Sequence, residues 1–301
     1  MQITLIALVL VAFVWQLAGN WADLSRLQLR LDYSYLALSA IPLFGRPFLS
    51  AFGWWQVVRK LKGELGIASA IHIYFISGLA RYVPGPFLGS IGRALMAEEA
   101  GVPAVTATLS VLIELGLLVA SGVILGAIWT VLHLSNDQVI YMVLLGIFSL
   151  ILLNPRFFLP LLNRLLGRFK RKPIALNLHL GDMLQLLAPY LLNWMLNGLT
   201  FYLVLKAISP LGYDLFNIMG IYIVALTVAI FGLITPDGWG ARELALGNML
   251  VSFAAIPAVL ATGLAIFTRV WWMVSEAAWV GLALLLGRGR QAATPPLDEQ
   301  K

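Results

Sequence analysis

Long runs of apolar residues, separated by short polar segments, dominate the pattern along the chain. A helix that crosses the hydrocarbon core of a bilayer needs about 20 predominantly apolar residues. On this criterion we predict six transmembrane helices, at 3–19, 33–56, 104–132, 138–153, 183–208 and 258–286. The first run lacks a basic flank and a clear cleavage site, so we interpret it as a retained span and not as a signal peptide.

Two further apolar stretches are interrupted by proline and glycine. Residues 66–82 run into PGPFLGSIGR and resume as a short segment at 86–97. Residues 216–234 run into TPDGWGARE and resume at 243–256. Proline removes a backbone donor and breaks a helix interior. Each stretch is therefore predicted to be a pair of short helices and not an ordinary crossing.

Lysine and arginine are concentrated in segments that alternate with uncharged or acidic loops. Basic residues mark cytoplasmic loops, and the main groups lie at 154–173, at 59–62 and at 288–290. The loops near 135–138 and 209–214 contain Asp137 and Asp214 instead. The assigned sides of the loops agree only if each interrupted helix pair enters and leaves the membrane by the same face. We therefore predict two re-entrant helical hairpins, the first from the cytoplasm and the second from outside, with both chain termini cytoplasmic.

Composition supports a membrane protein and excludes several chemistries. The chain is 60% hydrophobic and 11% charged, against roughly 25% charged residues in soluble domains. The net charge is +6. The basic residues lie in short clusters between apolar runs, which argues against nucleic-acid binding. Cysteine is absent and the three histidines are scattered, so no metal site and no cofactor is expected. The basic segment 154–173 is either an amphipathic segment on the anionic inner leaflet or a plain loop.

A short internal repeat suggests two related halves. Pro103-Ala-Val-Thr-Ala-Thr recurs as Pro257-Ala-Val-Leu-Ala-Thr, and each copy opens a long apolar helix. Pro84 and Pro236 precede these copies by 19 and 21 residues, respectively. With the predicted orientation the copies point in opposite directions, as in the inverted repeats of many transporters. The predicted fold is an all-α polytopic domain over 1–287, with halves at 33–132 and 183–286 linked by 154–173, and a polar cytoplasmic tail at 288–301.

The proline breaks are candidate anion-binding sites. Backbone that leaves helical geometry at membrane depth is tolerated where it lines a site. A helix restarts after Pro86, and its free amides together with Arg81 and Arg93 suit phosphate or carboxylate oxygens. At the second break Asp237 is a candidate N-cap, with Arg242 and Glu243 in the first helical turn. The alternative is that Arg93, Arg242 and Glu243 belong to solvated turns.

Several charged residues fall inside predicted spans, where a charge costs about 2.5–3.5 kcal/mol unless it is paired or functional. They are Arg46, Glu114, Arg269 and Glu276. Superposing the two proline-initiated helices places Glu114 beside the position equivalent to Arg269, which predicts an ion pair between the halves. Whether such a pair is structural or lines a polar path stays open. Trp54, Trp55, Trp271, Trp272 and Trp279 are expected at the membrane interface or in packing.

These motifs, taken in order, resemble the lysylphosphatidylglycerol synthase transmembrane family, also called flippase-like domain proteins, over roughly 3–287. The family's first motif, K/R-Y-[LV]-P-G with a later G-R, is matched by Arg81, Tyr82, Pro84, Gly85, Gly92 and Arg93. The second, similar to P-G-G-x-G-x-R-E, is matched by Pro236, Gly238, Gly240, Arg242 and Glu243, with Asp237 in place of a glycine. The family's long helix usually contains E-R, whereas here Leu115 follows Glu114.

The resemblance implies translocation of an anionic lipid or a polyprenyl-phosphate-linked lipid between the leaflets of a bacterial inner membrane. We predict a head-group site in which Arg81, Arg93 and Arg242 hold the phosphate and Glu114, Arg269 and Glu276 line the middle. The other predicted members, at the two breaks, are Tyr82, Pro84, Gly85, Pro236, Asp237 and Glu243. The absence of a P-loop argues against direct coupling to ATP. Alternatives are an intramembrane enzyme or accessory subunit for glycosyltransfer or lipid modification, and a structural or regulatory membrane subunit. A homodimer or a glycosyltransferase partner is also considered.

Overall fold

The computed structural model describes residues 31–82, 88–133, 138–168, 178–209, 212–230 and 241–291. The predicted span at 3–19 and most of both proline breaks lie outside these ranges. The described chain is helical between short turns, which confirms the all-α prediction. Its helices are α3 (Tyr33–Lys60), α4 (Ile67–Gly78), α5 (Leu88–Glu99), α6 (Ala104–His133), α7 (Gln138–Leu153), α8 (Pro155–Arg168), α9 (Leu180–Ile208), α10 (Leu215–Ile230), α11 (Ala241–Ala254) and α12 (Ala258–Gln291), with a 3₁₀ turn at Leu79–Tyr82.

Four of the described helices, α3, α6, α9 and α12, are long and apolar enough to cross a membrane. They contain 28 to 34 residues, or about 42–51 Å at 1.5 Å per residue, which exceeds the roughly 30 Å hydrocarbon core. These four correspond to predicted spans. The segment predicted at 138–153 is α7, an apolar helix of 16 residues.

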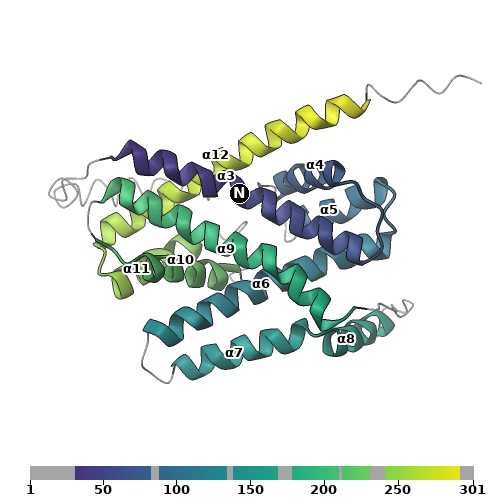
Figure 1. Cartoon of the computed structure of the whole chain (residues 1–301), viewed down its shortest axis with the longest axis horizontal. Coiled ribbons are helices and arrows are strands. Elements are labelled where there is room, and N and C mark those ends of the chain that lie inside the picture. Colours follow the sequence, from purple (N-terminus) through teal and green to yellow (C-terminus); the bar gives the residue numbers. More distant parts are fainter. Residues whose placement is uncertain are drawn as a thin grey trace, which may run out of the picture.

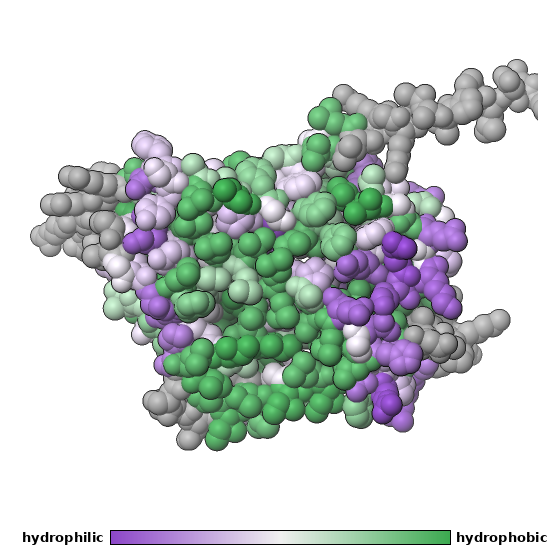
Figure 2. Space-filling view, in the orientation of Figure 1, coloured by the Kyte–Doolittle hydropathy of each residue, from purple (hydrophilic) through white to green (hydrophobic). Residues whose placement is uncertain are grey.

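The long helices run along the long axis of the molecule, and the two pairs of short helices lie near its opposite ends (Figure 1). Helices α4 and α5 are close to the end where α9 begins, whereas α10 and α11 are close to the end where α12 begins. On the face seen in Figure 2, an apolar band separates two more polar ends, as expected for a protein that spans a bilayer.

Helix contacts follow the same order in the two parts of the chain. Each helix contacts the next in the series α3 to α6 and again in the series α9 to α12. Within each pair the short helices pack on each other, α4 on α5 and α10 on α11. Between the two series, α3 packs extensively on α9, α4 packs on α12 and α10 packs on α6. Every short helix pair is therefore held against a long helix of the other series.

Close backbone approach seats α10 against α6. A Cβ atom added at Gly220 would lie 1.9 Å from Cδ1 of Trp129, so the indole ring rests directly on the α10 backbone. The Trp129 indole donates to Oδ1 of Asn217 at 3.1 Å, and Nδ2 of Asn217 donates to the Phe253 carbonyl at 3.0 Å. Because only glycine leaves room for the indole, this contact fixes the position of α10.

Candidate functional site

Buried polar side chains lie near the middle of the long helices. Arg46 is about 20 Å from either end of α3 at 1.5 Å per residue. Glu114 in α6, Asn193 in α9 and Arg269 in α12 are also well inside their helices, and all four residues are at most 9% exposed. Polar groups at such depth require partners. The structure gathers the partners of Glu114 and Arg269 into two clusters, and Asn193 accepts a hydrogen bond from Ser50.

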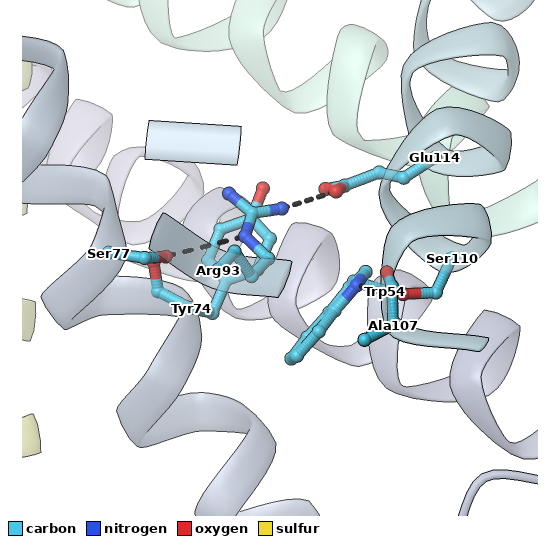
Figure 3. A network of polar contacts seen from close by, with 7 residues as sticks. All are labelled: Trp54, Tyr74, Ser77, Arg93, Ala107, Ser110 and Glu114. Atoms are coloured by element: carbon cyan, nitrogen blue, oxygen red, sulfur yellow. Dashed lines mark hydrogen bonds and ion pairs between the residues drawn. The ribbon is translucent and has the colours of Figure 1, made fainter. Parts of the chain in front are cut away.

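The first cluster brings Arg93 of α5 to Glu114 of α6 (Figure 3). The guanidinium donates to the Glu114 carboxylate and, through Nε, to the Ser77 hydroxyl at 3.4 Å. Cζ of Arg93 also lies 3.8 Å from the centroid of the Tyr74 ring and 5.6 Å from a ring of Trp54, both favourable cation–π arrangements. The cluster thus joins residues of α3, α4, α5 and α6.

Trp54 is held rigidly beside the first cluster. It is fully buried, and its indole Nε1 donates to the Ser110 hydroxyl at 3.0 Å. That hydroxyl in turn donates to the carbonyl of Ala107 at 2.7 Å. Since both donors are satisfied, the ring has a fixed orientation next to Arg93.

The second cluster is formed by α10, α11 and α12. Arg269 donates to the carboxylate of Glu243 at 3.0 Å, and both side chains are less than 10% exposed. The neighbouring Arg242 donates to the Tyr222 hydroxyl at 3.1 Å. Its Cζ lies 3.9 Å from the ring centroid of Trp272 in α12.

These pairs correct the predicted contact between Glu114 and Arg269. Each of the two residues is paired with the short helix that immediately precedes its own long helix, because these helices pack directly on each other. The charges are reversed between the clusters: the arginine is on the short helix in the first and on the long helix in the second. The alternative of solvated turns is wrong for Arg93, Arg242 and Glu243, which are 6–9% exposed.

A cavity of about 80 Å³ lies between α3, α4 and α12. This volume holds two or three water molecules at about 30 Å³ each. Tyr74, which also stacks on Arg93, and Arg46 are in its wall. Cζ of Arg46 lies 4.0 Å from the ring of Trp272, which also contacts Arg242. The cavity therefore adjoins both clusters. Among the described residues its lining is Arg46, Pro47, Ser50, Tyr74, Phe75, Gly78, Leu79, Glu276 and Val280.

Indole donors fix α12 against α3 beside this cavity. Trp279 donates to the carbonyl of Phe44 at 2.9 Å, and Trp271 donates to the Ser39 hydroxyl at 3.1 Å. The sequence does not reveal such hydrogen bonds. A tryptophan in an apolar run has the same sequence context whether its ring only packs or its indole N–H also donates.

The predicted site residues are distributed as follows. Arg93, Glu114, Arg242, Glu243 and Arg269 lie in the two clusters, and Glu276 lines the cavity. The backbone of Arg81 and Tyr82 forms part of the 3₁₀ turn after α4. Their side chains are not among those that the structure describes, and Pro84, Gly85, Pro236 and Asp237 lie outside the described residues.

Sequence reasoning missed Tyr74 and Tyr222 as members of the clusters. Trp54 and Trp272 pack in or against core clusters, as one of the two predicted roles required, and both also contact buried guanidinium groups, which the sequence did not indicate. Arg46, by contrast, was identified from the sequence, because it is a lone arginine in an apolar run. In the described ranges no group of three histidine, aspartate or glutamate side chains is placed to hold a metal ion.

Comparison with known families identifies the same likeness over almost the whole chain. Residues 2–278 match the model of a family described as the lysylphosphatidylglycerol synthase TM region. No curated protein and no solved structure gave a match to the chain.

Proposed function

The chain belongs to the lysylphosphatidylglycerol synthase transmembrane family, and from this premise we propose that it moves an anionic lipid between the two leaflets of a bilayer. The substrate is a phospholipid or a polyprenyl-phosphate-linked lipid. Its charged head group crosses between the helices while its apolar tail stays in hydrocarbon. The membrane concerned is the inner membrane of a bacterium.

The observation that carries the proposal is the surroundings of Arg242. This residue is 6% exposed, yet in the described part of the chain its hydrogen bond goes to a phenol, and no carboxylate lies within ion-pair distance. A guanidinium has five N–H donors, and a buried charge is costly unless an opposite charge compensates it. A phosphate group has the charge and the oxygen geometry that arginine binds best.

Arg46 strengthens the case for an anion at this position. Its guanidinium and that of Arg242 each lie about 4 Å from the centroid of the same Trp272 ring. Two guanidinium groups on one ring concentrate positive charge at this position, next to a cavity whose wall includes the carboxylate of Glu276. The adjoining cavity, with Ser50 and Tyr74 in its wall, offers polar side chains to a small part of the head group. We assign Arg242 and Arg46 to the phosphate.

The arrangement of the helices supports alternating access by two halves, 33–132 and 183–286. The matching order of contacts in the series α3 to α6 and α9 to α12, and the short helix pairs near opposite ends, are what an inverted repeat with two re-entrant hairpins requires. The cavity of about 80 Å³ is too small for a sugar-bearing head group. Passage therefore needs the halves to rock apart, with each buried ion pair keeping its short helix attached to its long helix.

The test is transport in liposomes that contain the purified protein and a fluorescent phosphatidylglycerol. Arg242→Gln is expected to slow the transbilayer rate by about 10- to 100-fold, because a hydrogen bond to a charged group contributes about 1.5–3 kcal/mol. Arg59→Gln is the matched control, since Arg59 is exposed at the end of α3 and should keep the parent rate. Equal rates for the two variants, or no rate above that of empty liposomes, would contradict the proposal.

The same liposomes distinguish transport from chemistry. The family description refers to a synthase, so a role in lipid modification is the competing function. Mass spectrometry of the extracted lipids after incubation with candidate substrates is expected to show unchanged masses. A covalent product that depends on the protein would instead support an intramembrane enzyme.

A further inference from the structure

Helix α8 is a separate element with its own capping signal. Asn154 interrupts the helix after α7, and its Oδ1 accepts from the backbone N–H of Arg156 at 3.1 Å. Pro155 occupies the first helical position, where its missing N–H costs nothing. The chain therefore stops α7 and starts α8 at a defined residue, at the end of the molecule where α9 begins (Figure 1).

The described side chains of α8 divide into two faces. At 3.6 residues per turn, the exposed residues fall within an arc of about 120°; they are Arg156, Phe157, Pro160, Arg164 and Arg168. The remaining arc contains partly or fully buried residues, and Phe158 packs there against the core cluster that includes Leu153 and Met183. One face is thus anchored to the protein, and the other presents three arginines.

The arginine face has no internal charge compensation. The α8 sequence, PRFFLPLLNRLLGR, contains no acidic residue. Phe157 is 56% exposed within the same arc. Exposing this apolar ring to water would give the helix no stabilisation. An exposed aromatic side chain among arginines is typical of helices that lie in the interface of a membrane.

The neighbouring helix α7 has an exposed apolar side of the kind that faces lipid. Helix α7 contacts α8 and exposes an apolar side along its length, with large residues 43–60% exposed at Ile140, Leu144, Ile147, Phe148, Leu150 and Ile151. The surface changes from apolar to polar toward the end of the molecule that holds α8 (Figure 2). The α8 arginines therefore lie just beyond the end of α7, which is where head groups would lie if the apolar side of α7 faces lipid.

We propose that the exposed face of α8 binds the head groups of anionic lipids in the leaflet at which α7 ends. Arg156, Arg164 and Arg168 contact phosphate groups, and Phe157 inserts below them. Each basic residue near an anionic surface contributes about fivefold to binding, so the three together favour the bound helix by about 100-fold. This binding does not depend on translocation.

A spin label on α8 tests the proposal directly. The chain has no cysteine, so Phe157→Cys provides one labelling site in the full-length protein. In nanodiscs that contain phosphatidylglycerol, the label is expected to be shielded from a water-soluble nickel chelate and accessible to oxygen. In nanodiscs of phosphatidylcholine alone, or after Arg156→Gln, Arg164→Gln and Arg168→Gln are added, accessibility to nickel is expected to rise.

Phe148→Cys is the matched control, because Phe148 lies on the apolar side of α7 and is 54% exposed. Its label should be shielded from nickel in both lipid compositions. The proposal is overturned if the label at position 157 has the same nickel accessibility with and without phosphatidylglycerol. High accessibility in both compositions indicates a face turned to water or to a soluble partner, and low accessibility in both indicates apolar anchoring alone.

Discussion

At the scale of single residues, the molecule buries full charges between apolar helices and gives them specific partners. Arg93 with Glu114 and Arg269 with Glu243 are buried ion pairs whose side chains are less than 10% exposed. Such a pair contributes little net stability, since both charges must be desolvated. Removing one partner is far more costly, because the other charge then stays buried with less compensation. The pairs therefore make each short helix dependent on its long helix.

This dependence predicts a non-additive pair of substitutions. Arg93→Gln should destabilise the protein by about 3–5 kcal/mol, because the Glu114 carboxylate remains buried without this guanidinium. Adding Glu114→Gln should recover part of the loss. Thermal unfolding in detergent, followed by tryptophan fluorescence, measures both variants and Glu114→Gln alone. Strictly additive effects would show that the two side chains do not interact.

At the scale of helices, close approach between α6 and α10 holds the second short pair in place. A Cβ added at Gly220 or at Gly122 would collide with a neighbour, Trp129 and Thr227 respectively, at 1.9 Å and 2.4 Å. Interiors are packed too densely to absorb such a collision without displacement. Small residues at these contacts are the usual means by which membrane helices pack closely.

Gly220→Ala should accordingly destabilise the fold, by about 1–3 kcal/mol for an overpacked contact. Gly116→Ala is the control, because Gly116 lies in α6 with no atom within 4 Å of the added Cβ. Alanine is there expected to be neutral or slightly stabilising, as alanine favours a helix over glycine. Melting temperatures and monodispersity after purification compare the two. Equal melting temperatures would mean that α10 shifts freely against α6.

At the scale of the whole molecule, the two short helix pairs are related by position and not by charge. Helices α4 and α5 lie near one end and α10 and α11 near the other (Figure 1), but the arginine and glutamate of the two ion pairs exchange places between the halves. A protein that alternates between two open states needs equivalent shapes on both sides. Under the proposed function the charges need not be equivalent, so the two ends can hold a phosphate with different strengths.

The opposite placement of the two pairs predicts the sidedness of their loops. In this cysteine-free chain, Ala100→Cys after α5 and Ser252→Cys near the end of α11 both create exposed thiols. A membrane-impermeant maleimide added to intact cells should label Ser252→Cys and spare Ala100→Cys until the cells are opened. Labelling of both positions from one side would contradict an inverted arrangement.

The sequence by itself determined the class of the protein and the approximate course of its helices. The long apolar runs and the prolines predicted α3, α6, α9 and α12 within a few residues. The bilayer sets the length of an apolar helix, and the missing N–H of proline limits where a helix can continue, so both effects act locally in the sequence. The same reasoning marked Arg46, Glu114, Arg269 and Glu276 as unusual, since charge inside an apolar run is costly wherever the run is placed.

Only the tertiary structure decided which of these charges meet. Glu114 binds Arg93 and not Arg269, and Arg242 meets Tyr222 and Trp272, because partners are chosen by which helix faces pack within a few ångströms of each other. Tyrosine and tryptophan occur throughout apolar helices, so their positions in the sequence do not reveal which of them contact a guanidinium. Membrane insertion is governed by local composition, whereas the site depends on packing between distant segments.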